Sequence, residues 1–152
     1  GKCNAPAKEC HRVVYDSKRD RLILVTGRRK SKKQEEPQMW AWDLKAGARE
    51  WLKLEMSGEV PPHFYRECVY IPKYDCLLNS PRTGKGKNGV VYHCDLAAGN
   101  RWRKTGFQLP LGVGPGTGLV YDEKLDVLVA LRNPTQGPCR VWIGRYVLDA
   151  GK

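Results

Sequence analysis

The sequence predicts an all-β protein built from three copies of one repeat, and three observations support this prediction. Nearly the same segment occurs about every 50 residues, as VVYDSKRDRLIL, VYIPKYDCLLN and VYDEKLDVLVA. The apolar runs in and around these segments are rich in β-branched and aromatic residues, and turn-forming residues separate them. No stretch has a convincing helical period, because the most helix-compatible one, residues 45–54, contains Gly47 and lies between strand signals.

Four positions define the repeat. Each copy has a Tyr, then a Lys three positions later, an Asp five positions later and a Leu seven positions later. The matching sets are Tyr15, Lys18, Asp20 and Leu22; Tyr70, Lys73, Asp75 and Leu77; Tyr121, Lys124, Asp126 and Leu128. Chance recurrence of the whole set is implausible, so we expect the same local structure in each copy.

The strand pattern of each copy is a hairpin followed by further strands. We expect the paired strands at 13–15 and 22–25, at 68–70 and 76–78, and at 119–121 and 127–131. A third strand is expected at 39–43, 90–95 and 141–147. A fourth strand, containing Trp51 or Trp102, completes the first two copies, whereas the third copy stops at LDAGK.

Four short antiparallel strands per unit of this length are typical of one blade of a β-propeller. The runs LILV and VLVAL are apolar throughout, which indicates sheets that are covered on both faces. We expect an N-terminal tail at 1–11 and a single structural unit at 12–152, with blades at about 12–62, 63–115 and 116–152.

The stretch WAWDLKAGAREWLKLEMSGEVPPHFYRECVYIPKYDCLL resembles the kelch pattern of aromatic-Asp, Gly-containing turn, Trp, Gly-Pro linker and Val-Tyr hairpin. The resemblance covers about residues 12–152 and points to kelch-repeat or galactose-oxidase-like propellers. It implies a kelch-like β-propeller segment of three four-stranded blades, the third incomplete. The glycine pair that ends the second strand in kelch repeats is replaced here by Thr26-Gly27, Asn79-Ser80 and Arg132-Asn133.

Three blades do not close a ring, since propellers have about four to eight. Two apolar sheet faces and one strand edge would stay exposed. Two arrangements would cover them: the remaining blades of a longer propeller, or a homodimer that closes a six-bladed ring. The missing fourth strand of the last copy favours the longer propeller.

Charge and hydropathy narrow the class of partner. The 27 Lys and Arg outnumber the 16 Asp and Glu, giving a net charge of +11, which favours an anionic partner. No apolar run approaches the roughly 18 residues that cross a bilayer, so we expect a soluble chain without a membrane partner. The first residues contain neither an initiator Met nor an apolar leader, and a secreted or periplasmic location stays open as one alternative.

The candidate binding site lies in the long connections between the second and third strands and in the linkers between blades. These connections are basic, whereas the other turns are short. The predicted contact residues are Arg28, Arg29, Lys30, Arg82 and Arg132 in the connections, and the cluster His63, Phe64, Tyr65 and Arg66 in the first linker. Two alternatives remain open: the basic residues are solvated loop tips, and Phe64 and Tyr65 seal the seam between blades.

The sequence predicts no catalytic residue, metal ligand or cofactor. Cys3 and Cys10 could form a disulfide in the tail, while Cys68, Cys76 and Cys94 fit buried thiols. His93 lies in Tyr92-His93-Cys94, which the galactose-oxidase resemblance makes worth checking, but no second His has ligand spacing to it.

The leading hypothesis is a non-catalytic scaffold that binds a protein or an anionic ligand through its basic loops. The alternative is a fragment of a larger secreted or periplasmic propeller enzyme that acts on carbohydrate or uses a metal.

Overall fold

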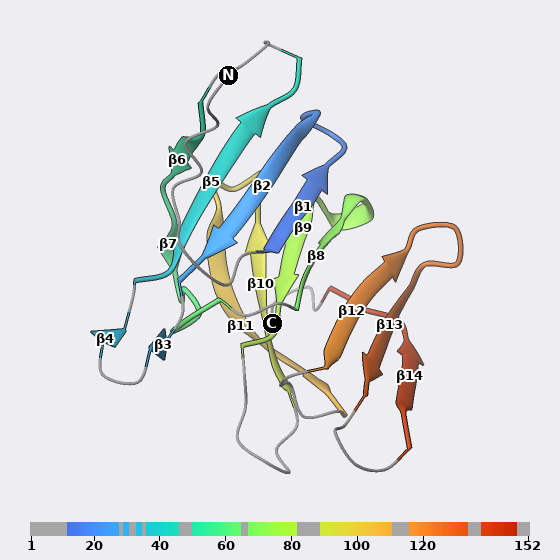
Figure 1. Ribbon diagram of the computed structural model, residues 1–152. Coiled ribbons are helices and arrows are strands. Elements are labelled where there is room, and N and C mark those ends of the chain that lie inside the picture. Colours follow the sequence, from blue (N-terminus) through green and yellow to red (C-terminus); the bar gives the residue numbers. More distant parts are fainter. Residues whose placement is uncertain are drawn as a thin grey trace.

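The structure of the chain is a computed structural model (Figure 1). It describes residues 12–27, 29–30, 33–34, 36–45, 50–64, 67–81, 89–110, 116–133 and 138–148, and in 29–30 and 33–34 it describes the backbone alone. The described residues form strands and one short 3₁₀ helix, η1 (Pro72–Tyr74). The predicted all-β class is therefore confirmed.

The first repeat forms an antiparallel sheet of four strands in the order β1-β2-β5-β6. Its strands are β1 (Arg12–Asp16), β2 (Arg21–Thr26), β5 (Gln38–Asp43) and β6 (Leu52–Leu54). A separate two-stranded hairpin, β3 (Arg29–Lys30) with β4 (Lys33–Gln34), lies in the connection between β2 and β5. Trp51 precedes the fourth strand instead of lying within it, so the predicted position of that strand is wrong by one residue.

The second repeat contributes four antiparallel strands to a five-stranded sheet. They are β8 (Cys68–Ile71), β9 (Cys76–Asn79), β10 (Gly89–Asp95) and β11 (Arg101–Leu109). The fifth strand, β7 (Ser57–Gly58), comes from the preceding linker and pairs in parallel with β11. Gly58 has φ +77°, and a Cβ there would overlap the carbonyl oxygen of Trp102, so this close pairing requires glycine.

Within the described residues, the third repeat forms a three-stranded antiparallel sheet. Its strands are β12 (Thr117–Asp122), β13 (Val127–Arg132) and β14 (Arg140–Gly144).

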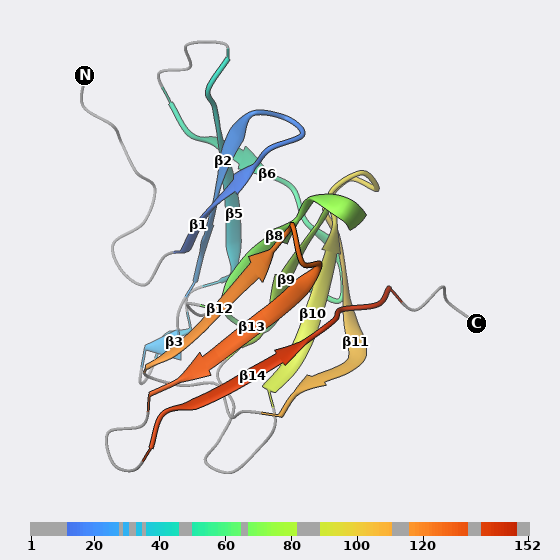
Figure 2. The ribbon, with the colours of Figure 1, turned by 90° about the vertical axis from the view of Figure 1, so that its right-hand side faces the viewer.

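The three sheets follow one another in space in chain order, and β8 contacts both β1 and β12 (Figures 1 and 2). The first strands of the three repeats therefore lie side by side. The turns at 17–20, 72–75 and 123–126 lie at one end of this row, and β2, β9 and β13 all finish at the opposite end (Figure 1).

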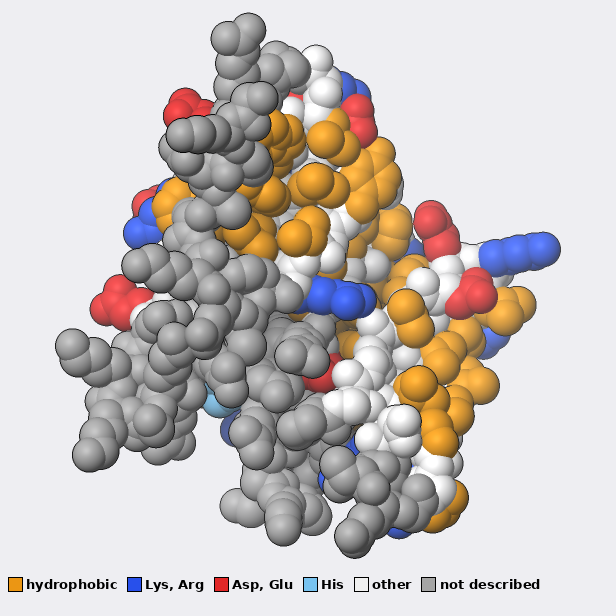
Figure 3. Space-filling model, in the orientation of Figure 1, with side chains coloured by type: hydrophobic (Ala, Val, Ile, Leu, Met, Phe, Trp, Pro, Cys, Tyr) orange, Lys and Arg blue, Asp and Glu red, His pale blue; other side chains and the backbone are white. Residues whose placement is uncertain are grey.

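Two apolar clusters fill the two junctions between the sheets. Between the first and second sheets, a buried cluster includes Ile23, Val25, Met39, Leu77 and Trp102. Between the second and third sheets, a buried cluster includes Ile71, Leu78, Val91, Leu128 and Ala130. Apolar side chains also cover parts of the surface over β1, β2 and β5 and over β12–β14 (Figure 3).

Candidate functional site

Four of the nine predicted contact residues lie outside the part of the chain that the structure describes. They are Arg28, Tyr65, Arg66 and Arg82, and the proposed disulfide pair Cys3 and Cys10 lies outside it as well. Arg29 and Lys30 form β3, where the backbone alone is described.

The described members of the predicted site occupy different environments. Phe64 is fully buried, its ring lies 5.2 Å from that of Trp102, and its N–H donates to the carbonyl oxygen of Gly27 at 3.0 Å. It therefore packs the seam between the first two sheets, the alternative role that the sequence left open. His63 is half-buried beside it, and half-buried Arg132 ends β13.

The recurring Tyr and Asp of the repeat form the same hydrogen bond in each turn. Asp20, Asp75 and Asp126 all have left-handed backbone, with φ of 50°, 49° and 54°. In each turn the Tyr hydroxyl donates to the Asp carboxylate, at 2.8 Å in the first, 3.1 Å in the second and 2.8 Å in the third. Asp is among the few residues that tolerate this backbone region, which explains why it recurs where the hairpin reverses.

Ion pairs link each turn to the next. The guanidinium of Arg19 donates two hydrogen bonds to the carboxylate of Asp75, at 2.7 and 2.8 Å, across the first junction. Lys73 Nζ contacts Asp126 Oδ2 at 2.6 Å across the second junction. In both cases a cation from one turn binds the left-handed Asp of the following turn. We call this series of contacts the turn ladder.

The first step of the ladder is the more buried one. Asp16 is fully buried and accepts from Arg19 at 3.2 Å and from Arg21 at 2.8 Å, so Arg19 bridges two carboxylates. The bonds from Arg19 lower the pKa of Asp75, and the bond to Asp75 raises the pKa of Arg19. Burial, together with neighbouring carboxylates, raises the pKa of Tyr70, so its hydroxyl remains a donor at neutral pH.

The second step is more exposed, yet its electrostatics are similar. The bond from Lys73 lowers the pKa of Asp126, and the same bond raises the pKa of Lys73. Burial and the bond to Asp126 raise the pKa of Tyr121 to about 12. All partners therefore keep their charges and donors through the neutral range.

A cleft of about 610 Å³ lies where the three turns approach one another. Its walls come from all three repeats: Ser17 and Lys18, Pro72 and Lys73, and Tyr121, Glu123 and Asp126. The charges of both signs on its walls give it no clear preference for an anion or a cation.

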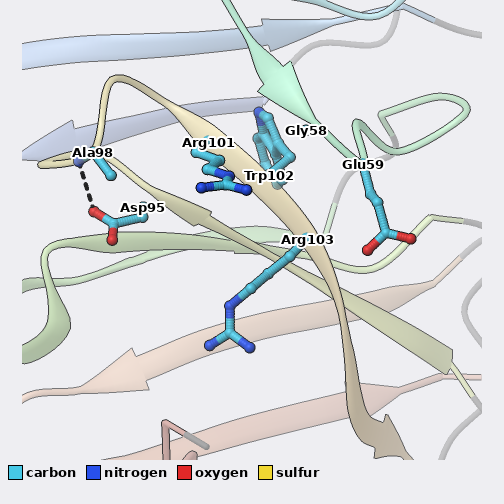
Figure 4. Close-up of a pocket in the computed structure, with 7 residues that line it drawn as sticks. All are labelled: Gly58, Glu59, Asp95, Ala98, Arg101, Trp102 and Arg103. Carbon is cyan, nitrogen blue, oxygen red and sulfur yellow. Dashed lines mark hydrogen bonds between the residues drawn. The ribbon is translucent and has the colours of Figure 1, made fainter. Parts of the chain in front are cut away.

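A second cavity, of about 350 Å³, lies beside β7 and β11 of the second sheet (Figure 4). Arg101 and Arg103 are two residues apart on β11, so their side chains leave the same face of the sheet. The carboxylates here, Asp95 and Glu59, accept backbone N–H groups of Ala98 at 2.9 Å and of Lys104 at 3.2 Å.

Within this cavity neither guanidinium forms an ion pair with either carboxylate. Among the described residues, Arg101 and Arg103 therefore place two cationic groups on one face of β11 without an ion pair.

His93 on β10 is buried beneath the segment that follows β14. Its Nδ1 lies 3.1 Å from the hydroxyl of Tyr146, whose ring packs against Tyr74 and Phe107. Burial lowers the pKa of His93 to about 4, and the nearby charge of Arg103 acts in the same direction. The imidazole is therefore neutral at pH 7 and joins the third sheet to the second.

Cys68, Cys76 and Cys94 are buried free thiols, whereas Cys139 is an exposed one. Burial raises the pKa of Cys68 and of Cys76 to about 12, so neither thiol ionises readily. The described residues contain no group of three or more His, Cys, Asp and Glu side chains that could hold a metal ion. In the same part of the chain, no helix has the length and apolar character that spanning a bilayer requires.

No protein-family model matches the chain, and a search of curated proteins finds no relative. The candidate site therefore depends on geometry. Sequence reasoning missed the bridging role of Arg19, because the repeat alignment selects the neighbouring Lys18. It also missed Arg101 and Arg103, although an Arg on each side of Trp102 in a predicted strand places both on one face.

Proposed function

We propose that the chain is a segment of a kelch-like β-propeller and acts as a non-catalytic scaffold whose basic rim binds an anionic ligand or an acidic protein surface. Two four-stranded meanders and one three-stranded meander lie in a row, and their first strands are side by side. The same Tyr–Asp hydrogen bond occurs in the turn of each repeat. Both features support the propeller arrangement.

One observation carries the binding proposal. β2, β9 and β13 finish at the same end of the row of sheets, and β5, β10 and β14 start there (Figure 1). The three connections between these strands therefore begin and end at one rim. Their sequences hold eight Lys and Arg against two Glu, and Arg132 ends β13 at the same rim. The basic residues of the connections are Arg28, Arg29, Lys30, Lys32, Lys33, Arg82, Lys85 and Lys87, and the acidic ones are Glu35 and Glu36.

Convergence on one rim matters because separate surface charges are screened over about 8 Å at physiological salt. Charges held on two neighbouring connections and at the end of β13 act together on one polyanion, and their binding weakens steeply as salt is added. The turn end, by contrast, pairs Arg19 and Lys73 with carboxylates and offers less net charge.

The test is binding of heparin, a sulfated polyanion, measured by salt-dependent elution. Charge reversal of Lys30, Lys32 and Lys33 to Glu should move elution to clearly lower salt. The matched control reverses Lys18, Lys45 and Lys104, three exposed lysines on other elements, and so has the same net charge. Equal shifts in elution salt for both triple variants would refute binding at the rim, because elution would then depend on net charge alone.

The cavity of Figure 4 provides a third arm of the same experiment. The double substitution Arg101→Gln and Arg103→Gln removes its two cations without adding acid. Because this cavity lies on β11 and not in the three connections, the rim proposal expects a smaller loss of heparin affinity than the loop variant gives. A larger loss of heparin affinity than in the loop variant would indicate that the anion binds in the cavity and not at the rim.

A further inference from the structure

Several of the positions that the two internal junctions bury are exposed on the two end sheets. Val120 on β12 and Val129 on β13 match, through the repeat, Val14 and Ile23 of the first copy and Val69 and Leu78 of the second. The first-copy and second-copy residues are between 0% and 9% exposed, whereas Val120 is 57% exposed. Its neighbours on the same face, Leu131, Val141 and Ile143, are 41%, 58% and 63% exposed. We call this surface the leading face.

The opposite end shows the complementary pattern. Val13 and Tyr15 occupy the positions of Cys68 and Tyr70 in the second repeat. The second-repeat residues are 0% and 8% exposed because they pack against the first sheet, but Val13 and Tyr15 are 47% and 50% exposed. We call this surface the trailing face. Leu24, which pairs with Val13 on the same face, is only 3% exposed, so the trailing face is open in part. Among the described residues, the end sheets therefore leave apolar side chains exposed on one face of each of the two kinds that meet at the internal junctions.

The turn ladder has open ends on the same two faces. At each internal junction a cation binds the left-handed Asp of the next turn. Lys124, in the third turn, occupies the position of Lys73, and among the described residues it has no ion pair. Asp20, in the first turn, accepts the hydroxyl of Tyr15 and has no cation from a preceding turn within the described chain.

We propose that the leading face of one chain packs on the trailing face of a second copy of the same chain. The inference rests on the proposed propeller arrangement, and it places Lys124 of each chain against Asp20 of its partner. Apolar shape and charge at this contact would repeat those of the two internal junctions. Two such contacts related by a two-fold axis close a ring of six repeats.

The first measurement is the mass of the chain in solution by light scattering and sedimentation. The expected species has twice the mass of one chain, which is 17.2 kDa. A single-chain mass at about 0.1 mM would overturn the proposal, since a contact of this kind should have a dissociation constant below that value. A series of masses that grows with concentration would also overturn it, because the contact would then form open filaments and not a ring.

Variants of the two faces test the head-to-tail geometry. Ile143→Lys alters the leading face and Val13→Lys the trailing face, and both side chains are exposed in the single chain, so neither should disturb its folding. Each variant alone should weaken association by at least about 100-fold, because a charge would be buried without a partner. An equal mixture of the two should form a mixed dimer, since one unaltered pair of faces remains.

A mixture that stays monomeric, or an Ile143→Lys variant that still dimerises, would refute the geometry. Unchanged thermal unfolding of each variant at low concentration confirms that its fold is intact.

The ladder contact has its own test in a double-mutant cycle. Lys124→Met and Asp20→Asn should each weaken the dimer by about 2- to 5-fold, and the double variant should be no weaker than either. Asn keeps the left-handed backbone and the bond from Tyr15, and Lys104→Met is the control for loss of an exposed lysine. Additive losses would show that the two residues do not meet.

This outcome is separable from that of the proposed function. A monomeric chain whose basic rim still binds heparin would refute the head-to-tail contact alone.

Discussion

Replacing Asp75 by Asn isolates the energy of the first step of the turn ladder. Asn keeps an oxygen that accepts from Tyr70 and tolerates the left-handed backbone of φ 49°, so the turn itself is preserved. What is lost is the charge that binds Arg19. Because Arg19 keeps Asp16 as a partner, the substitution leaves no guanidinium without a counter-charge.

The magnitude follows from the geometry and exposure of the pair. An exposed ion pair contributes about 0.2–1 kcal/mol after solvent screening. Here two parallel bonds of 2.7 and 2.8 Å join side chains that are 31% and 14% exposed, which places the pair above that range but well below a buried one. We expect Asp75→Asn to lower the free energy of unfolding by about 1–2 kcal/mol, equivalent to about 2–8 °C in Tm for a chain of this size.

The pH dependence gives the effect a signature. The pKa of Asp75 is lower in the folded chain than in the unfolded one, where it is about 3.9. Its stabilising contribution is therefore complete above about pH 4 and is lost as pH falls through the folded pKa. The difference between wild type and Asp75→Asn should be full at pH 7 and should shrink at pH values below about 4.

Urea unfolding followed by tryptophan fluorescence measures both quantities, since buried Trp102 reports on the first junction. Asp122→Asn is the control: this exposed Asp accepts the N–H of Leu125 at 2.9 Å, which Asn also does, so its effect should stay below about 0.5 kcal/mol. A loss for Asp75→Asn no larger than that of the control, or one that persists unchanged at acid pH, would refute the role of the ladder.

Three further predictions concern the second sheet and the thiols. Gly58→Ala should lower the free energy of unfolding by more than about 1 kcal/mol, because its Cβ would meet the Trp102 carbonyl at positive φ. Gly106→Ala on β11, where a Cβ meets nothing within 4 Å, should change it by less than about 0.5 kcal/mol, and thermal unfolding compares the two. The folded-state pKa of His93 is lowered to about 4, so the unfolded chain takes up the proton first and stability should fall as pH drops from about 6.5 to 4. His93→Gln should flatten that slope in pH-dependent urea unfolding, and an unchanged slope would contradict the assignment. In native alkylation mapped by mass spectrometry, Cys139 should react well before Cys68, Cys76 and Cys94, and early labelling of any of those three would contradict their burial.

The repeat predicted most of the strands, because strand and turn signals depend on local sequence. The three hairpins fall where the aligned Tyr, Asp and Leu placed them, and the recurring Asp proved to be the residue with left-handed backbone in each turn. β7 and the β3–β4 hairpin were missed, since strands of two residues are too short to show a period. Their pairing depends on the approach of distant or neighbouring backbone, which no local pattern records.

The candidate site was less predictable, because it depends on how side chains cross between repeats. Alignment selects Lys18 as the equivalent of Lys73, yet Arg19 makes the first contact. The two turns differ in conformation, since Pro72–Tyr74 forms a 3₁₀ helix while 17–20 form a plain turn. A shift of one residue in the contacting position follows from such a difference, and the repeat pattern does not contain it.

The direction of the ladder also decides how any further unit could join the stack. Each junction takes its cation from the earlier turn and its carboxylate from the later one, so the two faces of a repeat are not interchangeable. Two leading faces in contact would set Lys124 against Lys124, and two trailing faces would set Asp20 against Asp20. Like charges placed opposite each other repel, so a contact between two leading faces or between two trailing faces is disfavoured. The mixture of the two face variants therefore tests more than the mass of the dimer. It tests whether the opposite charges of the leading and trailing faces determine which faces pair.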